Sequence, residues 1–195
     1  MRKALVVSLL MLALFVTAPA HAAIITYQAV LSAANENPPV PSPGTGMAVV
    51  TINDIANEMR VQVDFSGLTS GVTSAHIHCC AVPPTNAMVA TTTPTFTGFP
   101  IGVMFGSYDN TFDLLSASSY NPAFVTAQGG LANARAVLLN GLANNLSYLN
   151  IHTTNFAGGE IRGFLEPVDT SVPEPATLAL LGLGLAGALA RRTRR

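Results

Sequence analysis

Between residues 59 and 65 the chain reads Met59-Arg-Val-Gln-Val-Asp-Phe65, a strict alternation of apolar and polar residues. Successive side chains of a β-strand point to opposite faces of a sheet, so a period of two gathers the apolar residues on one face. This alternation predicts a half-buried strand, with one face against a core and the other toward water.

Six further stretches have the composition of short strands, and turn clusters such as Asn37-Pro-Pro39 separate them. Short strands at this spacing predict a mainly β domain folded as an antiparallel sandwich. Between its two apolar ends the chain keeps about 150 residues, enough for one domain with its own core. The further predicted strands are 24–31, 46–53, 73–78, 105–115, 147–152 and 160–166.

Residues 118–140 depart from the strand pattern and predict a short helical insertion in two pieces. Asn121 can cap the first piece, and Pro122 fits its first turn. Gly129-Gly130 breaks the helix, and an alanine- and leucine-rich second piece then runs up to Gly141.

The N-terminus has the pattern of a signal peptide over residues 1–22. Arg2-Lys3 is a basic region, residues 4–18 are apolar, and Ala20-His-Ala22 is a small-x-small cleavage site. Signal peptidase is therefore expected to release an exported chain that begins at Ala23.

The C-terminus, residues 169–195, carries a Pro-Glu-Pro motif, then an uncharged apolar run from Ala176 to Ala190, then four arginines in the last five residues. As a helix the run would measure about 22 Å, at about 1.5 Å per residue. A bilayer core is about 30 Å thick, so the predicted transmembrane helix is a short one. The arginines are expected to stay on the cytoplasmic side and leave the body outside.

This order of elements resembles the PEP-CTERM sorting signal of exported bacterial proteins, with Pro173, Glu174 and Pro175 as the sorting motif. The resemblance implies cleavage near the motif by an exosortase, a membrane transpeptidase, after the C-terminal helix has held the chain transiently in the inner membrane. It implies onward sorting to the cell envelope or extracellular matrix, where a matrix or surface partner is expected.

The region between the two apolar ends is acidic. Six of the nine basic residues lie in the ends, which leaves Arg60, Arg135 and Arg162 against all ten acidic residues. Three positive and ten negative charges give this region a formal net charge of −7, compared with −1 for the whole chain. A basic surface for nucleic acid is absent, and the negative charge suits a soluble surface protein or one that attracts cations.

The mature chain has three histidines, His76, His78 and His152, and they are candidate metal ligands. His76 and His78 lie two residues apart on a predicted strand, so their rings share one face, with Cα atoms about 6.5–7 Å apart. His152 ends another predicted strand, and the three rings converge if the two strands are neighbours or face each other. Three imidazoles suit copper or zinc. The alternative is that the rings make ordinary hydrogen bonds to backbone or carboxylate groups.

Four ordered motifs between residues 27 and 165 resemble the CHRD domain, first described in chordin. The resemblance implies an immunoglobulin-like β-sandwich of secreted proteins over residues 23–168, and no generally established enzymatic role. The chain departs from the usual pattern after His78, where a cysteine pair follows. The motifs are Leu31-Ser-Ala-Ala-Asn-Glu-Asn-Pro-Pro-Val40, Ala75-His-Ile-His78, Tyr148-Leu-Asn-Ile-His-Thr153 and Gly158-Gly-Glu-Ile-Arg-Gly163.

The His-x-His strand with a later histidine also resembles, more loosely, Cu/Zn superoxide dismutase, another Greek-key sandwich. The two metal sites of that enzyme need more histidines, including one that bridges both metals, and an aspartate. Three histidines cannot supply both sites. The alternative to a non-enzymatic role is therefore a copper- or zinc-binding redox protein whose site resembles that of the dismutase with fewer ligands.

Two glutamates, Glu36 and Glu160, are candidates to orient a histidine ring, because a carboxylate often accepts the N–H of a ligating imidazole. Glu36 precedes a Pro-Pro turn that would present its carboxylate rigidly. Glu160 and Arg162 share one face of a predicted strand, where an exposed ion pair would contribute about 0–1 kcal/mol. For Arg162 a structural role is favoured.

Cys79 and Cys80 are adjacent and are the two cysteines of the chain. In an oxidising compartment two free thiols are not expected to persist. A disulfide between the two neighbours is the favoured interpretation, and pairing between molecules or metal ligation beside His78 are the alternatives. The spacing is not Cys-x-x-Cys, so the zinc-ribbon and thioredoxin arguments do not apply.

The sequence contains no Gly-x-Ser-x-Gly elbow, no His-Glu-x-x-His helix and no phosphate-binding glycine loop. We therefore expect an exported, non-enzymatic structural or interaction protein of the envelope or matrix, with a metal site at its three histidines.

Overall fold

The structure is a computed structural model that describes residues 24–168. The expected signal peptide, the Pro-Glu-Pro motif and the apolar C-terminal run lie outside the described residues. Within residues 24–168, no helix has both the length and the apolar character needed to span a bilayer.

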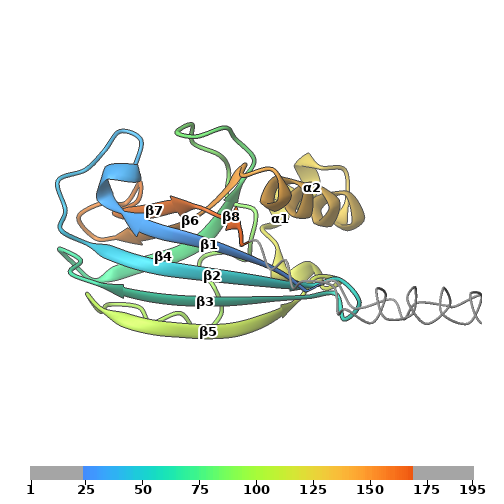
Figure 1. The fold of residues 1–195 in the computed structure, drawn as a ribbon, viewed down its shortest axis with the longest axis horizontal. Helices are drawn as coiled ribbons and strands as arrows, with labels where there is room; N and C mark the ends of the chain where they lie inside the picture. Colours follow the sequence, from blue (N-terminus) through green and yellow to red (C-terminus); the bar gives the residue numbers. More distant parts are fainter. Residues whose placement is uncertain (1–23, 169–195) are drawn as a thin grey trace, which may run out of the picture.

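Strands make up most of the described chain. They are β1 (Ile24–Ser32), β2 (Thr45–Asn53), β3 (Glu58–Ser66), β4 (Val72–Cys79), β5 (Gly106–Asp113), β6 (Ser147–Thr153), β7 (Ile161–Phe164) and β8 (Glu166–Pro167). They form one antiparallel sheet in the order β4-β6-β7-β1-β2-β3-β5, and β8 pairs with β1 (Figure 1).

The half of the sheet formed by β1, β2, β3 and β5 has one buried face and one exposed face. In β3 the apolar residues Met59, Val61, Val63 and Phe65 are buried, and each such burial contributes about 1.5–3 kcal/mol. The intervening polar residues face outward, and Arg60 pairs there with Asp109 of β5. The half-buried strand predicted from this stretch is confirmed.

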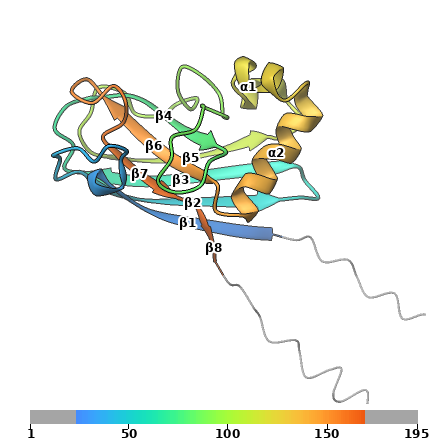
Figure 2. The ribbon, with the colours of Figure 1, turned by 90° about the horizontal axis from the view of Figure 1, so that it is seen from above.

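The other half, formed by β4, β6 and β7, is covered on both faces. Every residue of β6 is buried, a pattern typical of a strand that lies between two layers. One face carries Ala75 and Ile77 of β4 into the apolar core that it shares with β1, β2 and β3. In Figure 2 the orange β6 and β7 cross over the cyan strands, because the sheet curls on itself.

The predicted class, mainly β and antiparallel, is confirmed, but the immunoglobulin-like Greek-key sandwich is not. A sandwich of that kind consists of two separate sheets packed face to face. Here β1 pairs with β2 on one side and with β7 and β8 on the other. Hydrogen bonds therefore run through β1 from one half of the curled sheet to the other.

The predicted helical insertion is present in two pieces, α1 (Pro122–Ala127) and α2 (Leu131–Ala143). The side chain of Asn121 accepts a hydrogen bond from the backbone N–H of Ala123 and caps α1. Gly129 and Gly130 have φ values of 77° and 131°, which L side chains rarely adopt, and this explains the break between the helices. Helix α2 runs three residues beyond the predicted end of the insertion at residue 140.

Candidate metal centre

The three histidines lie on neighbouring strands and on one face of the sheet. In the register of β4 and β6, His76 is opposite Asn150, His78 is opposite Tyr148, and His152 is opposite Ser74. Alternation along both strands turns these side chains away from the apolar core. The condition for convergence, that the two strands be neighbours, is therefore met.

Loops cover this polar face and bury the three rings, which are 6%, 7% and 8% exposed for His76, His78 and His152. The connection between β4 and β5 folds back over the outer edge of β4, where the backbone N–H of Phe96 donates to the carbonyl of Ala75. The short β6–β7 connection covers His152. The site is thus a buried polar layer between a sheet and its loops.

Each ring uses one nitrogen in a hydrogen bond to a loop carbonyl. The bonds join His76 Nε2 to the oxygen of Pro94 at 2.7 Å, His78 Nδ1 to that of Ala87 at 2.9 Å, and His152 Nδ1 to that of Ala157 at 3.0 Å. A carbonyl oxygen only accepts, so each of these nitrogens carries the proton. The second nitrogen of each neutral ring then presents a lone pair.

The second nitrogens have no hydrogen-bond partner: His76 Nδ1, His78 Nε2 and His152 Nε2 are all buried and unpaired. One ligand atom from each of the three residues lies within 4.8 Å of the other two. A zinc–nitrogen bond is about 2.0–2.1 Å long, so nitrogens around a tetrahedral ion lie about 3.3 Å apart. The ligand atoms, at up to 4.8 Å, are at most about 1.5 Å farther apart than this, so the three residues fit a metal ion when their side chains move closer.

Burial keeps the rings neutral, which is the form that binds metal. It lowers the pKa of His78 and of His152 to about 4, while the hydrogen bonds to Ala87 and Ala157 oppose this effect. Burial also lowers the pKa of His76, and the bond to Pro94 opposes it. Near neutral pH the three nitrogens are therefore deprotonated.

Neither of the two candidate carboxylates, Glu36 and Glu160, accepts a hydrogen bond from a histidine ring. Glu160 accepts hydrogen bonds from the side chains of Ser42 and Thr153 and from the backbone of Thr69. Glu36 lies 3.9 Å from the guanidinium of Arg162, and burial raises its pKa to about 7 against the opposing effects of Arg162 and Asn150. The ring N–H groups meet backbone carbonyls, which occur at every position and leave no signal in a sequence.

Arg162 is buried, at 1% exposure, and does not form the expected exposed pair with Glu160. Its guanidinium donates to the carbonyls of Asn35 and Pro84 and to the side chain of Asn86. It also lies 4.7 Å above the ring of Tyr148. The residue holds together two loops that are far apart in the sequence, which is a structural role.

Tyr148 and Asn150 were not predicted as site residues, yet they share the polar face with His152. The ring of Tyr148 stacks on that of His78 with centroids 4.8 Å apart. Its hydroxyl accepts a hydrogen bond from the backbone of Ala87, the residue whose carbonyl accepts from His78. The period of two along β6, counted back from His152, is the signal that finds both residues.

Cys79 and Cys80 form a disulfide with each other, the favoured one of the three interpretations. Cys79 is buried on the core side of β4, opposite to the face of the histidines. The sulfur atoms lie against α2, where the carbonyl of Val137 is their neighbour. The structure therefore does not place the sulfur atoms with the candidate ligands.

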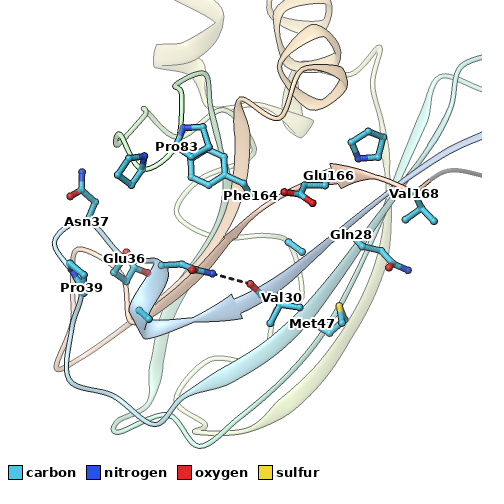
Figure 3. Close-up of a pocket in the computed structure, with 15 residues that line it drawn as sticks. Gln28, Val30, Glu36, Asn37, Pro39, Met47, Pro83, Phe164, Glu166 and Val168 are labelled. Atoms are coloured by element: carbon cyan, nitrogen blue, oxygen red, sulfur yellow. Dashed lines mark hydrogen bonds between the residues drawn. The ribbon is translucent and has the colours of Figure 1, made fainter.

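A cavity of about 770 Å³ lies beside the polar layer (Figure 3). Glu36 and Asn37 stand on one side of it, Pro83 and Phe164 on another, and Val30 with Met47 on the strands below. The hydrogen bonds of Arg162 to Asn35 and Pro84 tie two of these walls together. The cavity is lined by Glu36 but by none of the three histidines.

The curled antiparallel sheet and its buried histidines define a small β domain with a candidate metal centre. The sequence model of the CHRD domain matches residues 27–165, and the chain belongs to the CHRD domain family. The PEP-CTERM protein-sorting motif matches residues 171–195. It marks an exported protein that is sorted to the cell surface and implies recognition by an exosortase. No curated protein and no solved structure matches the chain.

Proposed function

We propose that this CHRD domain binds one copper or zinc ion through His76, His78 and His152 and acts as a non-enzymatic structural or interaction protein of the cell envelope or matrix. Exosortase recognition delivers it there, and its partner is a component of the matrix or surface. The sorting motif and the domain family support the location, and the histidine cluster supports the metal.

One observation carries the metal proposal: three neutral imidazoles each bury an unpaired nitrogen, and one ligand atom from each of these residues lies within 4.8 Å of the other two. A buried polar atom without a partner costs about 1–3 kcal/mol, and three such atoms in one place destabilise the fold together. A bound ion removes this cost, because it accepts all three lone pairs. Ordinary structural histidines would use both ring nitrogens or leave one in water.

The depth of the site supports a binding role rather than catalysis. Rings that are 6–8% exposed lie beneath loops that hydrogen bonds attach to them. A catalytic metal keeps an open position that its substrate can reach. A redox protein with a smaller, one-metal version of the dismutase site would need an open position of this kind. The loops that cover the histidines block the access of a substrate to such a position.

The test is the metal content of the full chain, exported to the periplasm and purified in mild detergent. Copper and zinc are measured by mass spectrometry for the wild type and for His76→Ala/His78→Ala. The matched control is Arg60→Ala/Gln62→Ala, which changes two residues at the same spacing on one face of β3. We expect about one ion per chain in the wild type and the control, and a loss of that ion in the histidine variant.

Two results would contradict the proposal. The wild type would stay free of metal after incubation with copper or zinc, or the histidine variant would keep its full metal content. Assays of superoxide dismutation on the metal-loaded chain then separate the binding role from the redox alternative, since the proposal expects no turnover.

A further inference from the structure

Asn150 occupies the middle of the histidine cluster. It lies directly across from His76 in the β4–β6 register and two residues before His152 on the same face of β6. Residues opposite each other in an antiparallel pair have Cβ atoms about 4.5–5.5 Å apart. Three histidines and one asparagine thus share one patch of the sheet.

The side chain of Asn150 carries an unpaired acceptor. The residue is 2% exposed, and its Oδ1 has no hydrogen-bond partner. It therefore joins His76 Nδ1, His78 Nε2 and His152 Nε2 as a fourth buried lone-pair donor on the same face. An amide oxygen with no donor nearby is suited to a cation.

Glu36 and Gly159 fix the position of this amide. A Cβ atom built on Gly159 would lie 2.6 Å from Asn150 Oδ1 and 2.8 Å from Glu36 Oε1, so the two side chains meet above the glycine. Glu36 in turn lies beside the buried Arg162. The amide of Asn150 thus lies between the carboxyl group of Glu36 and the backbone of Gly159.

We propose that Asn150 Oδ1 is the fourth ligand of the metal centre, and that Glu36 orients the Asn150 amide from behind. This inference rests on the three-histidine site proposed above. It completes a set of three imidazole nitrogens and one amide oxygen, the number that a tetrahedral zinc site requires. A site with four protein ligands is closed, so it holds the two strands and their loops together and leaves no position for a substrate.

The ligand set also selects the ion. Thiolate and thioether ligands favour Cu(I). Cys79 lies on the face of β4 opposite to the histidines and is bonded to Cys80. Imidazole nitrogens with one oxygen suit a divalent ion, and tetrahedral geometry favours Zn²⁺. Glu36 would then act on the ion through Asn150, not through a histidine ring.

The test uses Co²⁺ as a probe for zinc, because its visible spectrum reports coordination. The full chain, freed of metal, is titrated with Co²⁺ as wild type, Asn150→Ala, Asn150→Asp and Ser147→Ala. Ser147 is the matched control, since it lies on β6, is buried and has an unpaired Oγ, but faces the core. Azide is then added to each Co²⁺-loaded protein to detect an open coordination position.

We expect Asn150→Ala to bind Co²⁺ at least about tenfold more weakly than the wild type, and its spectrum to change with azide. The spectra of the wild type, Asn150→Asp and Ser147→Ala should not respond to azide. The nearly isosteric Asn150→Asp variant keeps a ligand oxygen, and it maintains the test if the alanine variant fails to fold.

The outcomes separate the two proposals. If the wild type binds no Co²⁺, the metal-binding function itself fails. If the wild type binds one Co²⁺ and Asn150→Ala binds it equally well without an azide response, the function stands and the assignment of Asn150 is overturned. An azide response in the wild type contradicts the closed site.

Discussion

His76, His78 and His152 each donate one ring N–H to a loop carbonyl, and that bond decides what the other nitrogen can do. The bond selects the tautomer, and burial selects the neutral ring. Neither the carbonyls nor the burial is visible in the order of the residues. The sequence therefore indicated which residues are candidate ligands, and the fold shows which of their ring nitrogens have no hydrogen-bond partner.

The pH dependence of the metal-free protein tests this account of the histidines. The pKa of His78 and of His152 falls from 6.5 to about 4 on folding, so between these values the unfolded chain binds more protons. The free energy of unfolding should therefore fall as the pH is lowered from about 6.5 to about 4, by at most about 1.4 kcal/mol per pH unit for each ring. Urea unfolding in the presence of EDTA, followed by circular dichroism, measures the slope.

The titration of Glu36 has the opposite effect on the free energy of unfolding over nearly the same pH range. Its pKa rises from 4.5 to about 7 on folding, so its stabilising effect is present below 4.5 and is lost as the pH rises toward 7. Removing this titration with Glu36→Gln should make the fall in stability toward acid steeper than in the wild type. An equal or shallower slope in Glu36→Gln would show that Glu36 does not titrate in this window.

Gly159 is required by its conformation and by its neighbours. Its φ is 129°, and a Cβ atom there would lie 2.8 Å from Glu36 Oε1. Gly159→Ala should lower the free energy of unfolding by about 1–3 kcal/mol. The control is Gly158→Ala, where a Cβ meets no atom within 4 Å and a change within about 0.5 kcal/mol is expected. Equal losses in the two variants would show that the contact with Glu36 and Asn150 has no influence.

At the scale of elements, the regular sequence patterns predicted the strands and helices, but they did not predict how the loops that connect them fold. The alternation in β3 and the glycine pair between α1 and α2 both act locally, and both are found where they were expected. The loop over β4 has no such pattern. It is placed by contacts such as that of Arg162 with Pro84, which lies 78 residues away.

Helix α2 contains a glycine, Gly141, in its last turn, although glycine has a low helix propensity. Replacing a glycine within a helix by alanine usually stabilises it by about 1 kcal/mol. Here a Cβ would lie 2.6 Å from Cys80 Sγ and 2.7 Å from Ser147 Oγ. The absence of a side chain thus allows α2 to pack on the disulfide and on β6.

Gly141→Ala should therefore destabilise the protein by about 1–3 kcal/mol, because overpacking outweighs the gain in propensity. Thermal and urea unfolding measure the change. The neighbouring exposed residue of α2 provides the control, since Asn140→Ala should be neutral or slightly stabilising. A stabilised Gly141→Ala protein would show that the contact between the helix and the disulfide yields easily.

At the scale of the whole molecule, the strands were predicted but their pairing was not. Composition and period mark each strand separately, whereas the partner of a strand depends on contacts across the whole chain. β1 pairs with β2, which is close in sequence, and with β7, whose partner residue Arg162 is 130 positions from Ser32. That second pairing turns two expected sheets into one curled sheet. It also brings Glu36, which lies four residues after the end of β1, up to Asn150 and the histidine face.

We expect delivery to the cell surface to depend on the C-terminal sorting motif. The Pro-Glu-Pro motif lies within the match to the PEP-CTERM signal, so Pro173 and Pro175 should be needed for cleavage by an exosortase. Pro173→Ala/Pro175→Ala should leave the chain uncleaved and in the inner-membrane fraction. Mass spectrometry of the fractionated protein measures this, and Pro167→Ala, in β8 and outside the motif, should be processed like the wild type. Normal cleavage of the double variant would show that the apolar run and the arginines are sufficient for recognition.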